Sequence, residues 1–253
     1  MARKKIDRQS RLLEIIANTG YGRIEDLAGS LYVSEQTIRR DIFELDQAKK
    51  LRRTHGGAVF LGGVESQDYI QRRFSATDVK HRIAEKVVSL ISDGDSIFLD
   101  AGTTCEVIAK ALHARRDLKI VTYSLAAAMH LKDRNDFTIA LPGGFLRHID
   151  GSLFGGPVEG FMEKFRFDCS IISVSGISPS GELADDDHWE VANVKLAIQR
   201  SQNVILASDS SKFAKPGHVA LCTFDDVSMF VTDGLPQTSL GAQIQDQVDV
   251  HLV

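Results

Sequence analysis

The stretch VSEQTIRRDIFEL, residues 33–45, predicts a helix with two different faces. Ser34 is a good N-cap, because its hydroxyl oxygen can accept a hydrogen bond from a free backbone N–H at the start of a helix over residues 35–47. At about 100° per residue, three aliphatic side chains of this helix fall on one narrow stripe. They are Ile38, Ile42 and Leu45. This stripe is expected to face the helices that precede it.

The opposite face of this predicted helix carries Gln36, Arg40 and Phe43, with Arg39 and Thr37 on its flanks. A helix that reads the major groove of DNA needs an apolar side that fixes its pose and long hydrogen-bond donors near its N-terminus. Arginine can pair bidentately with guanine, and glutamine with adenine. The pattern therefore predicts a recognition helix.

Two other helices are predicted before it. Residues 8–18 place apolar side chains at helical spacing, and Gly20 follows where a C-terminal cap is expected. Residues 24–31 form a second amphipathic segment, with Glu25 and Asp26 in the first turn, where negative charge suits the helix dipole. Three helices in this order are typical of a helix-turn-helix domain.

The segment after the recognition helix, LRRTHGGAVF at residues 51–60, predicts a tight hairpin, or wing, whose basic side chains contact phosphate oxygens. Helix and wing together supply the predicted DNA contacts: Ser34, Gln36, Thr37, Arg39, Arg40, Arg52, Arg53 and His55. The alternative is a small helical bundle with a solvated, arginine-rich face. The order of the elements favours the DNA-binding interpretation.

The distribution of charge along the chain points the same way. The 253 residues carry a formal net charge of −4. Residues 1–55 hold 12 Lys and Arg against 8 Asp and Glu, whereas the remainder holds 18 against 26. A basic segment followed by a larger acidic one predicts that only the front of the chain meets a polyanion.

The composition, with 43% hydrophobic and 25% charged residues, is that of a soluble globular protein. No run approaches the roughly 18 apolar residues of a membrane span, and the first residues, MARKKIDRQSR, lack the apolar core of a secretory signal. We therefore expect a cytoplasmic protein with no membrane partner. Cys105, Cys169 and Cys222 stand singly, so we expect reduced, packed thiols and neither a metal nor a cofactor.

The motifs VSEQTIRRDI at 33–42 and LRRTHGGA at 51–58 resemble the signature of the DeoR family of bacterial transcriptional regulators. Two positions depart from the family pattern. Lys49 stands where the family usually has the glycine that closes the recognition helix, and Phe43 is apolar on a face that is usually polar. Phe43 either contacts a thymine methyl group or packs on a neighbouring subunit; the sequence leaves both open.

Beyond the winged helix-turn-helix domain, residues 1–60, the sequence predicts a linker over 61–80 and an effector-binding sensor domain over 81–253. Short apolar runs alternate with helical stretches in the sensor domain. The runs cover residues 96–100, 118–122, 137–141, 169–174 and 203–207. Strands that are apolar throughout, with helices between them, predict a mainly parallel α/β sheet covered on both faces.

Ligands of such sheets bind beyond the carboxyl ends of the strands. The loop at 100–104 joins a strand end to a helix start, where free N–H groups and two hydroxyls can hold a phosphate or similar anion. The glycine turn at 142–147 ends in Arg147, whose guanidinium can clamp an oxyanion. Taken singly, such features are more often helix caps or surface ion pairs, but several of them follow successive strands.

The family resemblance extends over this region too. It implies a fold similar to ribose-5-phosphate isomerase and glucosamine-6-phosphate deaminase, and an effector that is a phosphorylated or sulfonated sugar-type metabolite. Strand-end position and resemblance together give these candidate contacts: Asp100, Gly102, Thr103, Thr104, Thr122, Ser124, Gly143, Gly144, Arg147, Asp187, Glu190, Lys195 and Lys212. The sequence of residues 165–183 most resembles the glycerol-3-phosphate regulon repressor branch of the family. Tyr123 and the acidic run at 185–189 depart from that branch.

These features predict a transcriptional regulator, most simply a repressor of a carbohydrate or related catabolic operon, which leaves its operator when the effector binds. A homodimer or homotetramer is expected, because one recognition helix reads too few base pairs for genomic selectivity. The alternative is a sugar-phosphate isomerase with an appended DNA-binding module, with Glu190 or Asp187 as general base and a lysine that stabilises an enediolate. A DNA-binding protein without a ligand is a third class.

Overall fold

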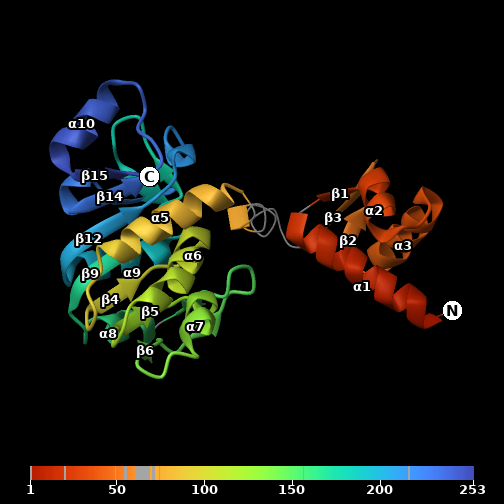
Figure 1. Cartoon of the computed structure of the whole chain (residues 1–253), viewed down its shortest axis with the longest axis horizontal. Coiled ribbons are helices and arrows are strands. Elements are labelled where there is room, and N and C mark those ends of the chain that lie inside the picture. Colours follow the sequence, from red (N-terminus) through yellow and green to blue (C-terminus); the bar gives the residue numbers. More distant parts are fainter. Residues whose placement is uncertain are drawn as a thin grey trace. The chain divides into compact units, whose positions relative to one another are not determined.

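A computed structural model divides the chain into an N-terminal unit, Met1–Ser75, and a C-terminal unit, Ala76–Val253 (Figure 1). Within the parts of the chain that the structure describes, no helix is long and apolar enough to cross a membrane. The described parts are residues 2–19, 21–48, 50–53, 56–60, 69, 72–73, 75–155, 157–215 and 217–253.

The N-terminal unit contains the three predicted helices followed by the predicted hairpin. Its elements are α1 (Ala2–Thr19), β1 (Tyr21–Arg23), α2 (Ile24–Leu31), α3 (Glu35–Gln47), β2 (Leu51–Arg53) and β3 (Gly57–Phe60). The hairpin strands β2 and β3 are antiparallel, and β1 pairs with the other side of β3. Strand β1 was not predicted, because three residues are too few for a hydrophobic pattern.

Helix α3 begins where the sequence predicts. Ser34 has an extended backbone, and its Oγ accepts a hydrogen bond from the backbone N–H of Thr37 at 3.3 Å. The predicted apolar stripe lies in the core of the N-terminal unit, whose buried side chains come from all three helices and the hairpin. They are Leu12, Ile16, Ile24, Leu27, Ala28, Ile38, Ile42, Leu45, Leu51 and Ala58. This core sets which face of α3 remains exposed.

Polar contacts between α1 and α3 add to this core. The Asp41 side chain is only 1% exposed and accepts hydrogen bonds from Arg8, with Nε at 2.5 Å and Nη2 at 3.1 Å, and from Gln9 at 3.1 Å. Glu44 accepts from Lys5 and from Gln9, both at 2.8 Å, and these hydrogen bonds lower the pKa of Glu44. Helix α1 begins at Ala2, earlier than predicted, so that Lys5 lies within it. Residues 2–7 were not predicted as helical because their apolar residues show no helical spacing.

The C-terminal unit is built on a seven-stranded sheet in which every pair is parallel, in the order β15-β14-β12-β9-β4-β5-β6. All five predicted strands are present. The strands are β4 (Ser96–Leu99), β5 (Lys119–Thr122), β6 (Thr138–Ala140), β9 (Phe167–Ile172), β12 (Ser201–Ala207), β14 (Met229–Thr232) and β15 (Asp249–Leu252). The prediction missed β14 and β15, which extend the sheet at one edge.

Helices cover both faces of this sheet (Figure 1). One face packs against α5 (Thr77–Ser89), α6 (Thr103–Ala111) and α7 (Leu125–Leu131). The other packs against α8 (Pro157–Met162), α9 (His188–Gln199) and α10 (Ser239–Gln247). Side chains alternate between the two faces as strand geometry requires, so that within β4 the residues Ile97 and Leu99 face the first layer and Phe98 the second.

Smaller elements surround the carboxyl edge of the sheet. A second, antiparallel sheet has the order β10-β11-β13, and a hairpin pairs β7 with β8. Their bounds, with those of the 3-10 turns, are β7 (Phe145–Leu146), β8 (Leu153–Phe154), β10 (Gly176–Ile177), β11 (Leu183–Asp185), β13 (Val219–Cys222), η1 (Leu112–Ala114), η2 (Ser210–Lys212) and η3 (Phe224–Asp226). A bridge between Ser124 and Ser152 joins the hairpin to the end of β5.

We predict that Asp41→Asn lowers the free energy of unfolding of the N-terminal unit by about 1–3 kcal/mol, because it removes the charge that Arg8 pairs with at a buried position. Hydrogen–deuterium exchange of the α1 and α3 amides in the full chain measures this loss. Glu35→Gln is the control: its partner Arg39 is exposed, so the change should stay within about 0.5 kcal/mol. Equal exchange in the two variants would contradict a structural role for the Arg8–Asp41 pair.

Candidate functional site

The exposed face of α3 carries the predicted reading side chains. Gln36 is exposed, and the side chains of Arg40 and Arg39 are 79% and 53% exposed. Each arginine has a partner one turn away on the same helix: Arg39 pairs with Glu35 at 3.1 Å and Arg40 with Glu44 at 3.6 Å. Exposed pairs of this kind contribute at most about 1 kcal/mol, so a phosphate or a guanine can replace the carboxylate at small cost.

The other predicted DNA contacts lie beside this helix or in the hairpin. Ser34 and Thr37, which share a hydrogen bond of 2.9 Å between their hydroxyls, stand at the N-terminus of α3. Arg53 has an exposed side chain in β2, and its backbone N–H donates to Asp46 at 3.0 Å, which ties the strand to α3. Arg52 is also part of β2. His55 lies outside the described residues, and so does Lys49, which stands where the family usually has a glycine.

Most of the predicted effector residues lie at the carboxyl edge of the sheet of the C-terminal unit. Asp100 directly follows β4, and α6 begins at Thr103, the residue directly after its N-cap Gly102. Gly102 has a φ of +105°, which a side chain rarely allows, and it offers no side chain to cap α6. Thr103 is half-buried and Thr104 buried. The first-turn amides of α6 are therefore placed for an anion.

Asp100 itself is held inside the protein. Its side chain is 2% exposed and accepts hydrogen bonds from the backbone N–H of Ala101 at 2.8 Å, the backbone N–H of Ser173 at 2.9 Å and the hydroxyl of Tyr123. Burial raises the pKa of Asp100 to about 7, although these hydrogen bonds oppose the shift. The carboxyl group thus links the ends of β4, β5 and β9 and has partners within the protein.

Arg147, which follows β7, holds three carboxyl groups with one guanidinium. Nε donates to Asp150 at 2.9 Å, Nη1 donates to Asp187 at 3.0 Å, and Nη2 contacts both Asp150 and Glu190. Burial disfavours the charged guanidinium, but the hydrogen bonds and charges of Asp150 and Glu190 outweigh it and raise the pKa of Arg147 well above its usual range. We call these four residues the Arg147 cluster.

The Arg147 cluster is continuous with helix α9. Asp187 is the N-cap of α9, and its Oδ1 accepts from the backbone N–H of Trp189 at 2.7 Å while Oδ2 accepts from Arg147. One carboxyl group therefore connects the β7–β8 hairpin to the start of a helix that covers the sheet. Asp150 was not among the predicted site residues. Its position three residues after Arg147 could have indicated the ion pair between them.

The cluster lies in an acidic environment. Burial, and the charges of Asp185 and Asp100, raise the pKa of Glu190 to about 8 despite the neighbouring Arg147. Burial also raises the pKa of Asp185, whose Oδ1 accepts from the Ser175 hydroxyl at 2.6 Å. Because carboxyl groups outnumber guanidinium groups here, Glu190 binds a proton near neutral pH.

Two predicted lysines lie in different surroundings. The charge of Lys212, in η2, acts on Asp185, which places it on the side of the acidic groups. Lys195 is exposed on α9, and its charge acts on Cys222 of β13. The five-residue step from Glu190 turns it about 140° around the helix. The structure therefore does not bring Lys195 into the Arg147 cluster.

The remaining predicted residues have local partners. Thr122 is buried and its Oγ1 accepts from the Ser124 backbone N–H at 3.0 Å; Ser124 in turn caps α7 by accepting from Ala127 at 3.1 Å. Gly144 has a φ of +146° and its Cα faces the backbone carbonyl of Phe154 so closely that a Cβ would collide with it, whereas Gly143 has open space. These residues shape the edge of the site.

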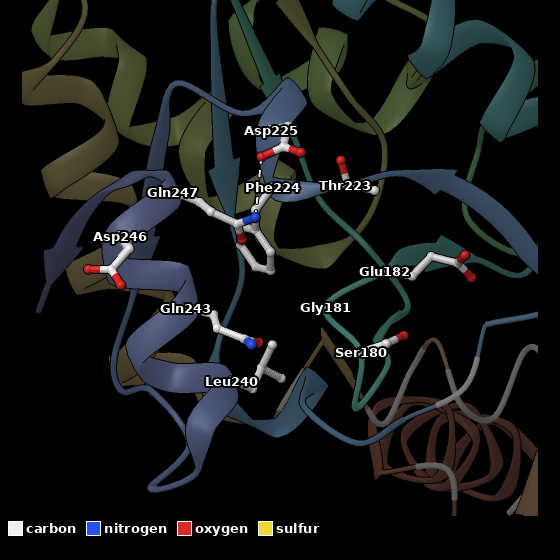
Figure 2. Close-up of a pocket in the computed structure, with 10 residues that line it drawn as sticks. All are labelled: Ser180, Gly181, Glu182, Thr223, Phe224, Asp225, Leu240, Gln243, Asp246 and Gln247. Atoms are coloured by element: carbon white, nitrogen blue, oxygen red, sulfur yellow. Dashed lines mark hydrogen bonds between the residues drawn. The ribbon is translucent and has the colours of Figure 1, made fainter.

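A separate pocket of about 480 Å³ lies between the 178–182 loop, η3 and α10 (Figure 2). Its floor includes Phe224 and Leu240, and Gln247 donates to Asp225 across its rim at 3.3 Å. The full lining is Ser180, Gly181, Glu182, Thr223, Phe224, Asp225, Leu240, Gln243, Asp246 and Gln247. None of the predicted effector contacts belongs to this lining.

Two family models match the chain. Residues 8–63 match the DeoR-like helix-turn-helix domain, and residues 75–234 match the DeoR C terminal sensor domain. The second match covers more than half of the chain by itself.

Three curated relatives resemble the chain over nearly its whole length. The glycerol-3-phosphate regulon repressor of Haemophilus influenzae is 37% identical over 91% of this chain and 90% of its own. The protein of the same name from Escherichia coli is 36% identical over 96% of both chains. The HTH-type transcriptional repressor CsqR of Escherichia coli is 36% identical over 97% of this chain and 94% of its own.

Among solved structures, ribose 5-phosphate isomerase A from Methanocaldococcus jannaschii resembles part of the chain. The match has a TM-score of 0.41 and 15% sequence identity, and it covers 55% of each chain.

The raised pKa of Glu190 predicts a pH dependence of stability. Its pKa is about 8 in the folded chain and about 4.3 in an unfolded one, so the folded state holds an extra proton between these values. The stability that this proton supplies is complete below pH 4 and is lost as the pH rises through 8. We expect the free energy of unfolding to fall by roughly 1 kcal/mol per pH unit between pH 5 and 8.

Urea unfolding followed by the fluorescence of Trp189, the neighbour of Glu190 and the one tryptophan of the chain, measures this slope. Glu190→Gln should flatten it, with a residual slope from Asp100, whose raised pKa acts in the same direction. Glu85→Gln, at an exposed position of α5, should keep the wild-type slope. A Glu190→Gln protein with an unchanged slope would show that Glu190 is already ionised at pH 5.

Proposed function

The chain belongs to the DeoR family of transcriptional regulators, and from this premise we propose that it represses a carbohydrate or related catabolic operon and is released by an anionic, sugar-type effector. The N-terminal unit binds operator DNA through α3 and the β2–β3 hairpin. The effector binds at the Arg147 cluster of the C-terminal unit. The named relatives are repressors, which agrees with a role in regulation rather than in catalysis.

The observation that carries the DNA-binding part is the division of α3 into two faces. Ile38 and Ile42 are buried in the core, while Gln36 and Arg40 are exposed on the opposite side. Their side chains are therefore free to enter a major groove, where glutamine and arginine have good base partners. We further propose a homodimer or homotetramer, because paired recognition helices are needed to read two half-sites of an operator.

The effector part of the proposal is supported by Arg147. A guanidinium presents two parallel N–H donors that match the oxygens of a phosphate or sulfonate as well as those of a carboxylate. An anionic effector would compete with Asp187 and Glu190 for these donors. The carboxyl groups that it displaces would then accept hydrogen bonds from the hydroxyl groups of a sugar. The first-turn amides of α6 offer a second place for negative charge.

Release from DNA requires an effector that binds one arrangement of the protein better than another. Asp187 offers the link, because it pairs with Arg147 and also caps α9. Replacing it as the partner of Arg147 would alter the start of α9 and the β7–β8 hairpin together. Both carboxylates considered for the isomerase alternative, Asp187 and Glu190, pair with Arg147.

We predict that Arg40→Ala weakens operator binding by about 1–3 kcal/mol and relaxes sequence preference, because Arg40 reads a base edge. Arg53→Ala should weaken binding to all duplexes about equally and reduce the slope of log K against log salt by about one unit, because Arg53 contacts a phosphate. Titrations of operator and unrelated duplexes at several salt concentrations measure both effects. Identical behaviour of the two variants would contradict these roles.

We predict that Arg147→Ala binds the operator like the wild type but no longer responds to effector, because it lacks the anion-binding fork. Arg147→Lys keeps the charge without the fork and should respond weakly. A thermal-shift screen with phosphorylated and sulfonated sugars and glycerol 3-phosphate identifies the effector of the wild type, and operator release is then titrated in all variants.

The matched control is Lys110→Ala, which removes an exposed cation from the last turn of α6 and should respond like the wild type. An Arg147→Ala protein that is still released by the effector would place the effector elsewhere.

A further inference from the structure

Phe43 is an apolar side chain on the otherwise polar face of α3. Its side chain is 49% exposed, whereas the apolar residues of the opposite stripe are buried. Within the described part of the N-terminal unit, it belongs neither to the hydrophobic core nor to the partly buried side chains packed against that core. The fold therefore gains little from an aromatic ring at this position.

The position of Phe43 on the helix is more informative than its exposure alone. At about 100° per residue, it lies within about 20° of Gln36 and about 60° of Arg40 around the axis. Along the axis, it lies about 4.5 Å beyond Arg40 and about 10.5 Å beyond Gln36. Successive base pairs are separated by about 3.4 Å, so a helix lying along the groove would bring Phe43 near a base pair neighbouring that of Arg40.

We propose that Phe43 makes this chain selective for thymine at one operator position, by packing its ring against the C5-methyl group in the major groove. Thymine is the one base that presents an apolar group there, and phenylalanine is among the side chains that contact it. The inference rests on the proposed binding of operator DNA through α3, and it names a base that this binding would select.

Charge around Phe43 favours DNA over a second copy of the chain as the partner of this face. Arg40 lies one turn before Phe43 on the same stripe, and Arg39 lies on its flank with an exposed side chain. In a second copy of this face each guanidinium already pairs with Glu35 or Glu44 of its own helix, so two such faces would offer each other no complementary charge. A duplex has the opposite charge and satisfies them while the ring enters the groove.

The test removes one methyl group from the DNA. A duplex is first selected with the full-length wild-type protein from a random library, and each thymine is then replaced in turn by deoxyuridine, which lacks only the C5-methyl group. Burying one methyl group changes a binding constant by about fourfold. We expect one thymine per half-site at which the wild type loses about fourfold in affinity, and about fifteenfold when both half-sites are changed.

The same duplexes are titrated with Phe43→Ala and Phe43→Asn. Both variants should bind the thymine duplex more weakly than the wild type and should bind the thymine and deoxyuridine duplexes equally at that position. Phe43→Leu keeps an apolar side chain and should retain part of the preference. Thermal unfolding checks that the variants are folded, which is expected because the ring lies outside the core.

Tyr32→Asn is the matched control. Tyr32 is the other strongly exposed aromatic side chain in the described part of this unit, 94% exposed in the turn between α2 and α3, with a left-handed backbone that asparagine tolerates. Because Tyr32 lies off the α3 stripe, its replacement should leave the thymine-to-deoxyuridine ratio of the wild type unchanged.

Two results would overturn the proposal. In one, the wild type binds the selected duplex tightly but discriminates against deoxyuridine at no position. In the other, Phe43→Ala keeps the wild-type preference for thymine and instead changes the sedimentation coefficient, which would assign Phe43 to a contact between subunits. Failure of DNA binding as a whole is distinguishable from both, because the selection would then enrich no duplex.

Discussion

In a parallel sheet covered by helices, both faces pack against apolar cores. Polar side chains therefore lie mainly at the edge where the strands end. Along each strand the side chains alternate between two apolar layers, so that Ile97 and Phe98 of β4 contribute to different cores. The first residue after β4, Asp100, is still buried and must find partners within the protein. The chemistry of the C-terminal unit is therefore concentrated at the carboxyl edge of its sheet.

This edge holds more carboxyl groups than cations. The carboxyl groups therefore share one guanidinium or accept hydrogen bonds from neutral donors. Arg147 is shared by three carboxyl groups, and Asp100 takes the hydroxyl of Tyr123 and two backbone amides in place of a cation. Burial and mutual repulsion raise the pKa of Glu190. Under the proposed function, an anion that binds Arg147 would replace Asp187 as its partner, and Asp187 also caps α9.

In the N-terminal unit, packing and recognition fall on opposite faces of one helix, α3. Its core fixes one side of α3, and Asp41 and Glu44 of that helix accept hydrogen bonds from side chains of α1. Gln36 and Arg40 thus remain on a face free of the core. An exposed aromatic residue on that face, Phe43, has a use only if something apolar meets it, and the major groove offers an apolar group at thymine.

The sequence alone determined the local features, because a helix or strand period is written in neighbouring residues. The bounds of α3, its Ser34 cap, its two faces and five strands of the parallel sheet could all be predicted in this way. Only the tertiary structure decided which polar groups meet. Arg147 and Glu190 are joined across more than 40 residues by the return of the chain to the same sheet edge, and Lys195 turns away although it follows Glu190 closely. Such pairings depend on topology and side-chain direction, which no spacing in the sequence records.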